Sequence, residues 1–162
     1  MSAGTQPDGE EYVTEFLQPV SLRSSGGGPS GLYLDVTYLF TTTGARPGQA
    51  RSQTRLSTRM YQYRLLDHNH RELLAYHWQP GHAFAGPDHP HLHVSAALDA
   101  QLDAVTRRKI DLDKLHVATG QVSLAAMVRM LIIEFGIAPL RHDWRETLDR
   151  TDLDLRTAAG DW

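Results

Sequence analysis

The order in which hydrophobic patterns follow one another limits the fold of this chain more than any other feature of its sequence. Residues 32–42, 54–66 and 73–78 alternate side chains between two faces and are rich in aromatic and β-branched residues, which is typical of strands. The turn-forming residues 67–70 join the last two segments into a hairpin. The first half of the chain therefore predicts an antiparallel meander.

The second half carries helical periodicity instead. From residue 123 to residue 135, apolar side chains recur at spacings of three and four, which indicates a helix with an apolar face. Ser123 and Gly136 are suited to cap its two ends. Asp143 and Glu146 have the spacing of a capping box that opens a final helix to about residue 156. Strands before helices, without βαβ alternation, predict an α+β fold: a curved antiparallel sheet covered by C-terminal helices.

The length of 162 residues suits one domain. We expect a single domain over residues 12–162 after a disordered tail at 1–11, with a short strand at 91–95 and a weaker helix at 98–108. The absence of cysteine excludes disulfides, thiolate metal sites and cysteine nucleophiles. From the polar start we expect no secretory signal, and no apolar run approaches the roughly 20 residues that span a bilayer. We therefore expect a cytoplasmic protein that does not bind membranes.

Seven of the nine histidines fall within residues 68–93. The first hypothesis for this stretch is metal-independent cleavage of RNA, with His91 and His93 as the acid–base pair and His89 assisting. Alternate residues of an extended segment share one face, about 7 Å apart at Cα, so a phosphodiester fits between the two imidazoles. Arg59 or Arg64, from the neighbouring hairpin, would bind the phosphate through a bidentate guanidinium. The resulting function is an endoribonuclease.

The second hypothesis gives the same histidines to a metal ion. His89, His91 and His93 alternate, and His-x-His on a strand is a known ligand arrangement whose third ligand often comes from another strand. Such a site would bind zinc or another divalent transition metal. Pro90 interrupts the row, and no glutamate occurs between Glu72 and Glu134 to complete a cupin pattern.

The third hypothesis is structural. His68 and His70 stand in the expected hairpin turn, where imidazoles bond to turn backbone. His77 stands between Tyr76 and Trp78, in a strand, and is interpreted as a hydrogen-bonded histidine of the sheet. Under this hypothesis the chain is a non-catalytic or metal-binding protein that acts through a partner. The three hypotheses stay open at the level of sequence.

Two surfaces point to partners. The net charge of −3 gives no general attraction for nucleic acid, but residues 46–72 hold six arginines against two acids. On the strand at 54–66, Arg59, Tyr61 and Tyr63 fall on one face with Arg55, a basic and aromatic surface of the kind that stacks single-stranded RNA. The alternative is that these tyrosines pack inside. The second face of the long helix carries Ala126, Met130 and Ile133. Because these residues are apolar, they predict a homodimer or a protein partner.

The middle of the chain resembles a known family. The resemblance lies in three short segments, YQYR at 61–64, LLAYHW at 73–78 and PHLHV at 90–94. They are similar to the tyrosine-rich hairpin and the proline- and histidine-rich segment of TumE-like toxins from bacterial toxin–antitoxin modules. Members carry Arg-Tyr-Asp-Asn where this chain has AYHW at 75–78. The resemblance covers about a fifth of the chain and implies a cytoplasmic toxin with an antitoxin partner, with His91 and His93 as matching residues.

Overall fold

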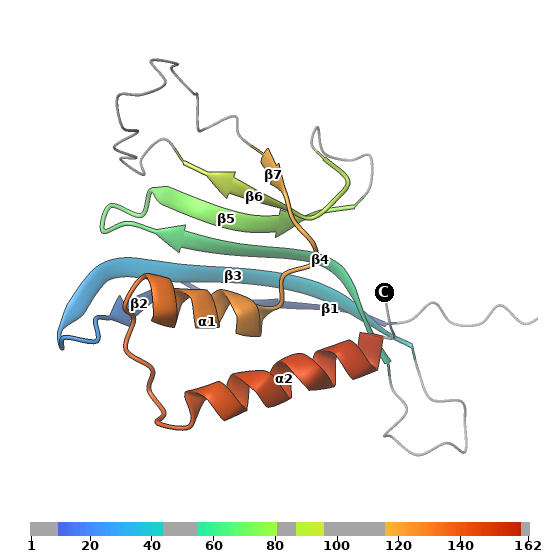
Figure 1. Ribbon diagram of the computed structural model, residues 1–162. Helices are drawn as coiled ribbons and strands as arrows, with labels where there is room; N and C mark the ends of the chain where they lie inside the picture. The colour runs from blue at the N-terminus through green and yellow to red at the C-terminus, as the bar shows by residue number, and fades with distance from the viewer. Residues whose placement is uncertain (1–9, 44–54, 81–86, 96–115, 160–162) are drawn as a thin grey trace, which may run out of the picture.

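The computed structural model describes residues 10–43, 55–80, 87–95 and 116–159 (Figure 1). Its elements are β1 (Glu10–Glu15), β2 (Val20–Arg23), β3 (Pro29–Thr43), β4 (Arg55–Leu66), β5 (Glu72–Trp78), β6 (His91–Val94), β7 (His116–Ala118), α1 (Leu124–Glu134) and α2 (Trp144–Ala159). In this part of the chain, seven strands form one open antiparallel sheet, and both helices cover the same face of it (Figure 1). The predicted α+β fold is confirmed.

The strands follow one another across the sheet in the order β1-β3-β4-β5-β6-β7. The long strand β3 pairs with β1 over its second half and with β2 over its first half, so these two short strands share one edge. From β3 to β6, each strand lies beside the next one along the sequence, as predicted for a meander. β6 and β7 form the other edge, and β7 closes it with three paired residues.

Several boundaries differ from those expected. Strands β1, β2 and β7 were not predicted, and β1 already includes Glu10 and Glu11, which were assigned to a disordered tail. The rest of that tail and the helix expected at 98–108 lie outside the described residues. Neither α1 nor α2 combines the length and the apolar character that crossing a bilayer requires.

The core lies between the sheet and α1. It contains alternate residues of the central strands together with apolar residues of the helix and the segment after it: Leu34, Val36, Tyr61, Tyr63, Leu65, Leu74, Met127, Leu131 and Ile137. The rings of Tyr61 and Tyr63 stack with centroids 4.9 Å apart. These tyrosines are 2% and 1% exposed, so they are packed in the core and do not form part of an exposed surface.

The residues that cap α1 are the two that the sequence predicted. Ser123 has extended backbone, and its side chain accepts a hydrogen bond of 3.0 Å from the N–H of Ala126, which satisfies one of the unpaired donors of the first turn of α1. Gly136 follows the helix with a φ of 63°, a left-handed conformation that glycine adopts without a Cβ clash. Both ends of α1 are therefore fixed by local sequence.

A β-bulge changes which residues of β4 share a face. Met60 pairs with Leu39 and Thr58 pairs with Phe40, so Arg59 is the extra residue between them. Thr58 consequently lies on the tyrosine face, where its hydroxyl is 2.6 Å from the Tyr38 hydroxyl. Strict alternation does not hold across a bulge, so the prediction that Arg59 shares a face with Tyr61 and Tyr63 stays a prediction.

The other face of the sheet carries the histidines. Tyr76 packs against the core, and its hydroxyl contacts the sulfur of Met130 on α1. Because successive residues of a strand point to opposite faces, His77 points away from the helices. The same argument applies to His91 and His93, which flank Leu92, a residue packed against the core.

Candidate metal centre

Strand register brings three histidines together from two strands. His91 and His93 belong to β6, and β5 pairs with it in antiparallel register, which makes His77 the direct partner of His91 and Ala75 the partner of His93. Side chains of directly opposed residues lie side by side, with Cβ atoms about 4.5–5.5 Å apart. His77, His91 and His93 thus form a compact triangle on the face away from the helices. We call these three residues the histidine triad.

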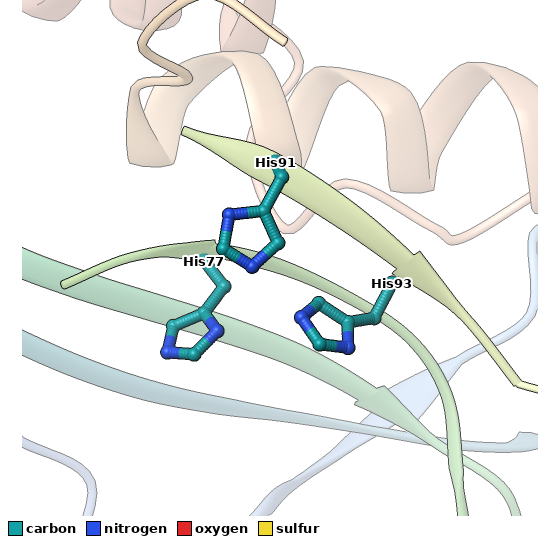
Figure 2. A group of neighbouring side chains, drawn as sticks. All are labelled: His77, His91 and His93. Atoms are coloured by element: carbon teal, nitrogen blue, oxygen red, sulfur yellow. The ribbon is translucent and has the colours of Figure 1, made fainter. Parts of the chain in front are cut away.

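The rings of the triad converge. Their centroids are 5.1 Å apart for His77 and His91, 5.4 Å for His77 and His93, and 4.8 Å for His91 and His93. One nitrogen from each ring can be chosen so that all three lie within 4.8 Å of one another. Figure 2 shows these nitrogens facing a shared space. Of the sequence hypotheses, the metal site is the one whose geometry this arrangement matches most closely.

Three imidazole nitrogens at this spacing are near the positions that a metal ion requires. Zinc binds imidazole nitrogen at about 2.0–2.1 Å with tetrahedral angles, which puts two ligand nitrogens roughly 3.3 Å apart. The widest pair of the triad therefore has to close by at most about 1.5 Å. Closing this gap would require the rings to rotate about their side-chain bonds.

His91 is oriented by the backbone of its own segment. Its Nδ1 lies 2.7 Å from the carbonyl oxygen of His89. A carbonyl only accepts, so Nδ1 carries the proton and donates this hydrogen bond. In the neutral ring, Nε2 then holds the lone pair that a metal ion needs. An imidazole whose other nitrogen donates to a carbonyl is the usual outer-shell arrangement of a metal-binding histidine.

His77 does not fit the interpretation as a hydrogen-bonded histidine of the sheet. Its Nε2 is buried and has no hydrogen-bond partner within the described residues. A buried polar group left without a partner costs about 1–3 kcal/mol, so a role for this nitrogen in the hydrogen bonding of the sheet is not what the structure shows. What brings His77 into the site is its pairing with His91 and the spacing of the ring nitrogens. The structure adds His77 to the candidate site, which the sequence interpretation missed.

His89 was expected as a metal ligand and as an assistant in acid–base chemistry, but it is not part of the triad. Its side chain is exposed, and its ring lies edge-on to that of His91 with centroids 6.0 Å apart. The hydrogen bond between His89 and the triad involves its carbonyl oxygen, which accepts from Nδ1 of His91. The alternation His89, His91, His93 stops at Pro90, because β6 begins at His91.

The two histidines of the hairpin turn are where the structural hypothesis places them. His68 and His70 are both exposed, and His70 has a φ of 59°. The ring of His70 rests 4.7 Å from that of Tyr33, and His68 bonds to the side chain of Asn69. These contacts give both residues a local role in the turn.

The residues expected to bind RNA do not assemble into one surface. Tyr61 and Tyr63 are inside the core, and burial raises the pKa of Tyr63 well above its usual range. Arg64 lies on the face of the triad, where its Nε is 3.0 Å from the Asp35 carboxylate and its Nη2 contacts the same oxygen. Arg59 is exposed at the bulge. A basic and aromatic surface was predicted from Arg55, Arg59, Tyr61 and Tyr63. For the two tyrosines this prediction is wrong, because both are buried.

The residues that strand register places around the triad include two alanines and one ion pair. Ala75 lies beside His93 in register, and Ala118 of β7 lies beside His91. The partner of His93 on β7 is His116. One strand further from Ala75, Arg64 is paired with Asp35, so the two charges compensate each other.

Comparisons with family models, curated proteins and solved structures find no match to this chain. The resemblance to TumE-like toxins therefore stays a prediction. The function is argued below from the site alone.

Proposed function

We propose that this protein binds a divalent transition metal ion, zinc in the first place, through His77, His91 and His93. The observation that carries the proposal is the convergence of three imidazole nitrogens to within 4.8 Å, from two strands that fix their spacing. A tetrahedral ion held by three protein ligands keeps its fourth position for water or another small ligand, as catalytic zinc sites do.

The donor set selects the class of metal. Imidazole is a suitable ligand for zinc, copper, nickel and iron, whereas calcium and magnesium require oxygen ligands. The triad offers nitrogen only, and the chain has no cysteine. Copper binds such sites more tightly than zinc at equal availability. Zinc is favoured because it accepts tetrahedral geometry without electronic preference.

The metal-independent ribonuclease expected from the sequence uses two of the same residues. His91 and His93 do lie together, but a phosphate also needs cationic donors, and Arg64 is already engaged with Asp35. The RNA substrate, the antitoxin partner and the homodimer stay predictions. Of the residues proposed to form a protein interface on α1, Ile133 is exposed, whereas Met130 contacts Tyr76.

A zinc titration of the untagged protein tests the proposal. Wild type should bind one zinc ion per chain in calorimetry. His77→Ala should weaken binding by more than the roughly 10–100-fold that loss of an outer-shell partner costs. His89→Ala is the matched control and should change the affinity little, because the hydrogen bond from His89 to the triad comes from its backbone carbonyl and its exposed ring lies only edge-on to His91.

Two results would count against this function. The first is an absence of stoichiometric binding by zinc, copper or nickel. The second is an equal loss of binding in His77→Ala and His89→Ala, which would favour the site expected from sequence. RNA cleavage that persists in a chelator and disappears in His91→Ala would support the metal-independent ribonuclease instead.

A further inference from the structure

The ligands of the triad point to a chemical reaction as well as to metal binding. We infer that a zinc ion held there activates water for attack on a small uncharged carbonyl substrate, such as a simple ester. This inference rests on the proposed metal centre. It names the reaction class and the substrate class that the same residues favour.

The first argument is the charge of the ligands. The three ligands of the triad are neutral imidazoles, and no carboxylate belongs to the cluster formed by the described residues. A zinc complex with these three ligands would therefore carry a net charge of 2+, with no anionic ligand to offset it. In sites of this type, the pKa of the zinc-bound water falls to about 7 from 15.7 in bulk, so a hydroxide is present at neutral pH.

The second argument is access. His91 is only 3% exposed, while His77 and His93 are partly exposed. Among the described residues, parts of the His77 and His93 side chains reach solvent, whereas the Nε2 atom of each of these two rings and nearly all of His91 are buried. A site whose nitrogens are buried to this degree suits a small molecule better than a polymer. The hydrogen bond from His91 to the His89 carbonyl keeps the shielded ring in one orientation.

The third argument concerns substrate charge. A phosphodiester needs cationic donors near the metal, which guanidinium groups supply best. The arginine that strand register brings toward the triad is Arg64, and its ion pair with Asp35 neutralises it. Ala75 lies between Arg64 and His93 in register, so among the described residues strand register places no unpaired cationic side chain beside the triad to help the metal hold an anion. An uncharged carbonyl compound needs none.

The reaction balances with water as the only co-reactant. The zinc-bound water first releases a proton to the solvent. The hydroxide oxygen then forms a bond to the carbonyl carbon of the ester, and the carbonyl oxygen takes the negative charge beside the ion. The bond between that carbon and the alkoxy oxygen breaks, and the departing alkoxide takes up a proton from the solvent to give the alcohol, which balances the proton released in the first step. Nothing is oxidised or reduced.

The fourth ligand position can be tested without any substrate. In the protein loaded with cobalt(II), the visible spectrum should change with pH, with a midpoint near 7 as bound water ionises. Azide, a small anion that binds open metal sites, should change it again. A one-to-one cobalt complex whose spectrum responds to neither pH nor azide has no exchangeable ligand, and it would overturn the inference while leaving the metal centre intact.

Activity is then measured on the zinc protein with 4-nitrophenyl acetate. The rate should rise over the same pH range as the cobalt transition and fall at least about 10²-fold in His77→Ala. His89→Ala should retain it. Hydrolysis no faster than with free zinc would contradict the inference. So would faster cleavage of the phosphodiester bis(4-nitrophenyl) phosphate, which would point to an anionic substrate. Failure of the protein to bind any metal would refute the proposed function itself.

Discussion

His77 on β5 is the direct cross-strand partner of His91 on β6, and their ring centroids are 5.1 Å apart. This single pairing converts a histidine-rich stretch into a candidate site. His91 and His93 alone are two ligands on one strand, and His77 supplies the third from the neighbouring strand. The account of this protein depends on that third ligand.

Zinc should stabilise the folded protein. A ligand that binds only the native state adds about 2.7 kcal/mol when its concentration is 100 times the dissociation constant. For a chain of this length, that corresponds to a rise in the melting temperature of roughly 5–10 °C. Thermal unfolding with and without zinc measures the effect. His93→Ala should lose most of the rise, and a rise that His93→Ala retains in full would place the binding site elsewhere.

Metal affinity should fall in acid. A zinc ion and a proton compete for the same imidazole lone pairs, and free imidazole side chains take up a proton near pH 6.5. Zinc affinity should therefore drop at least about tenfold between pH 7.5 and pH 5.5. Calorimetric titrations at the two values check this. An affinity that is constant over the range would be inconsistent with histidine ligands.

Asp67, in the hairpin turn between β4 and β5, should make the stability of the fold sensitive to acid. Although desolvation by burial raises its pKa, hydrogen bonds from the N–H groups of Arg71 and Asn69 and from the Arg71 guanidinium lower the pKa from 3.8 to about 2. The carboxylate thus contributes stability that is present above pH 4 and is lost as the pH falls toward 2. Asp67→Asn should be less stable at pH 7 and should lose less stability than wild type between pH 4 and pH 2, as urea unfolding at each pH will show.

The core beneath α1 should be sensitive to truncation. Met127 is completely buried between the helix and the sheet, so Met127→Ala should lower the free energy of unfolding by about 2–5 kcal/mol. Ile133 is on the same helix and 55% exposed, and Ile133→Ala should change it by only about 0.5 kcal/mol. Denaturant titrations compare the two. A similar cost at both positions would mean that α1 is packed differently.

Much of the fold could be predicted from local pattern. The segments that became β3, β4, β5 and α1 have clear periodicity, and the turn at 67–70 fixes the pairing between β4 and β5. The short edge strands β1, β2 and β7 were missed, since a few residues on a sheet edge show little alternation. The bulge at Arg59 was also missed, because the sequence around it carries no signal that an extra residue interrupts the ladder.

The candidate site was half predicted. His91 and His93 could be placed on one face from their spacing alone, because they occupy alternate positions of one strand. The role of His77 could not, because residues 79–90 separate β5 from β6 and a loop of that length does not fix the register between two strands. The expectation that the third ligand of a His-x-His site comes from another strand was the signal that could have led to it.

X-ray absorption spectroscopy of the zinc-loaded, untagged protein tests the central claim most directly, because it reports the ligands of the metal itself. The account predicts three imidazole nitrogens at about 2.0–2.1 Å and one further light-atom ligand, with one imidazole lost in His77→Ala and none in His89→Ala. A first shell made mainly of oxygen, or one that His77→Ala leaves unchanged, would contradict it.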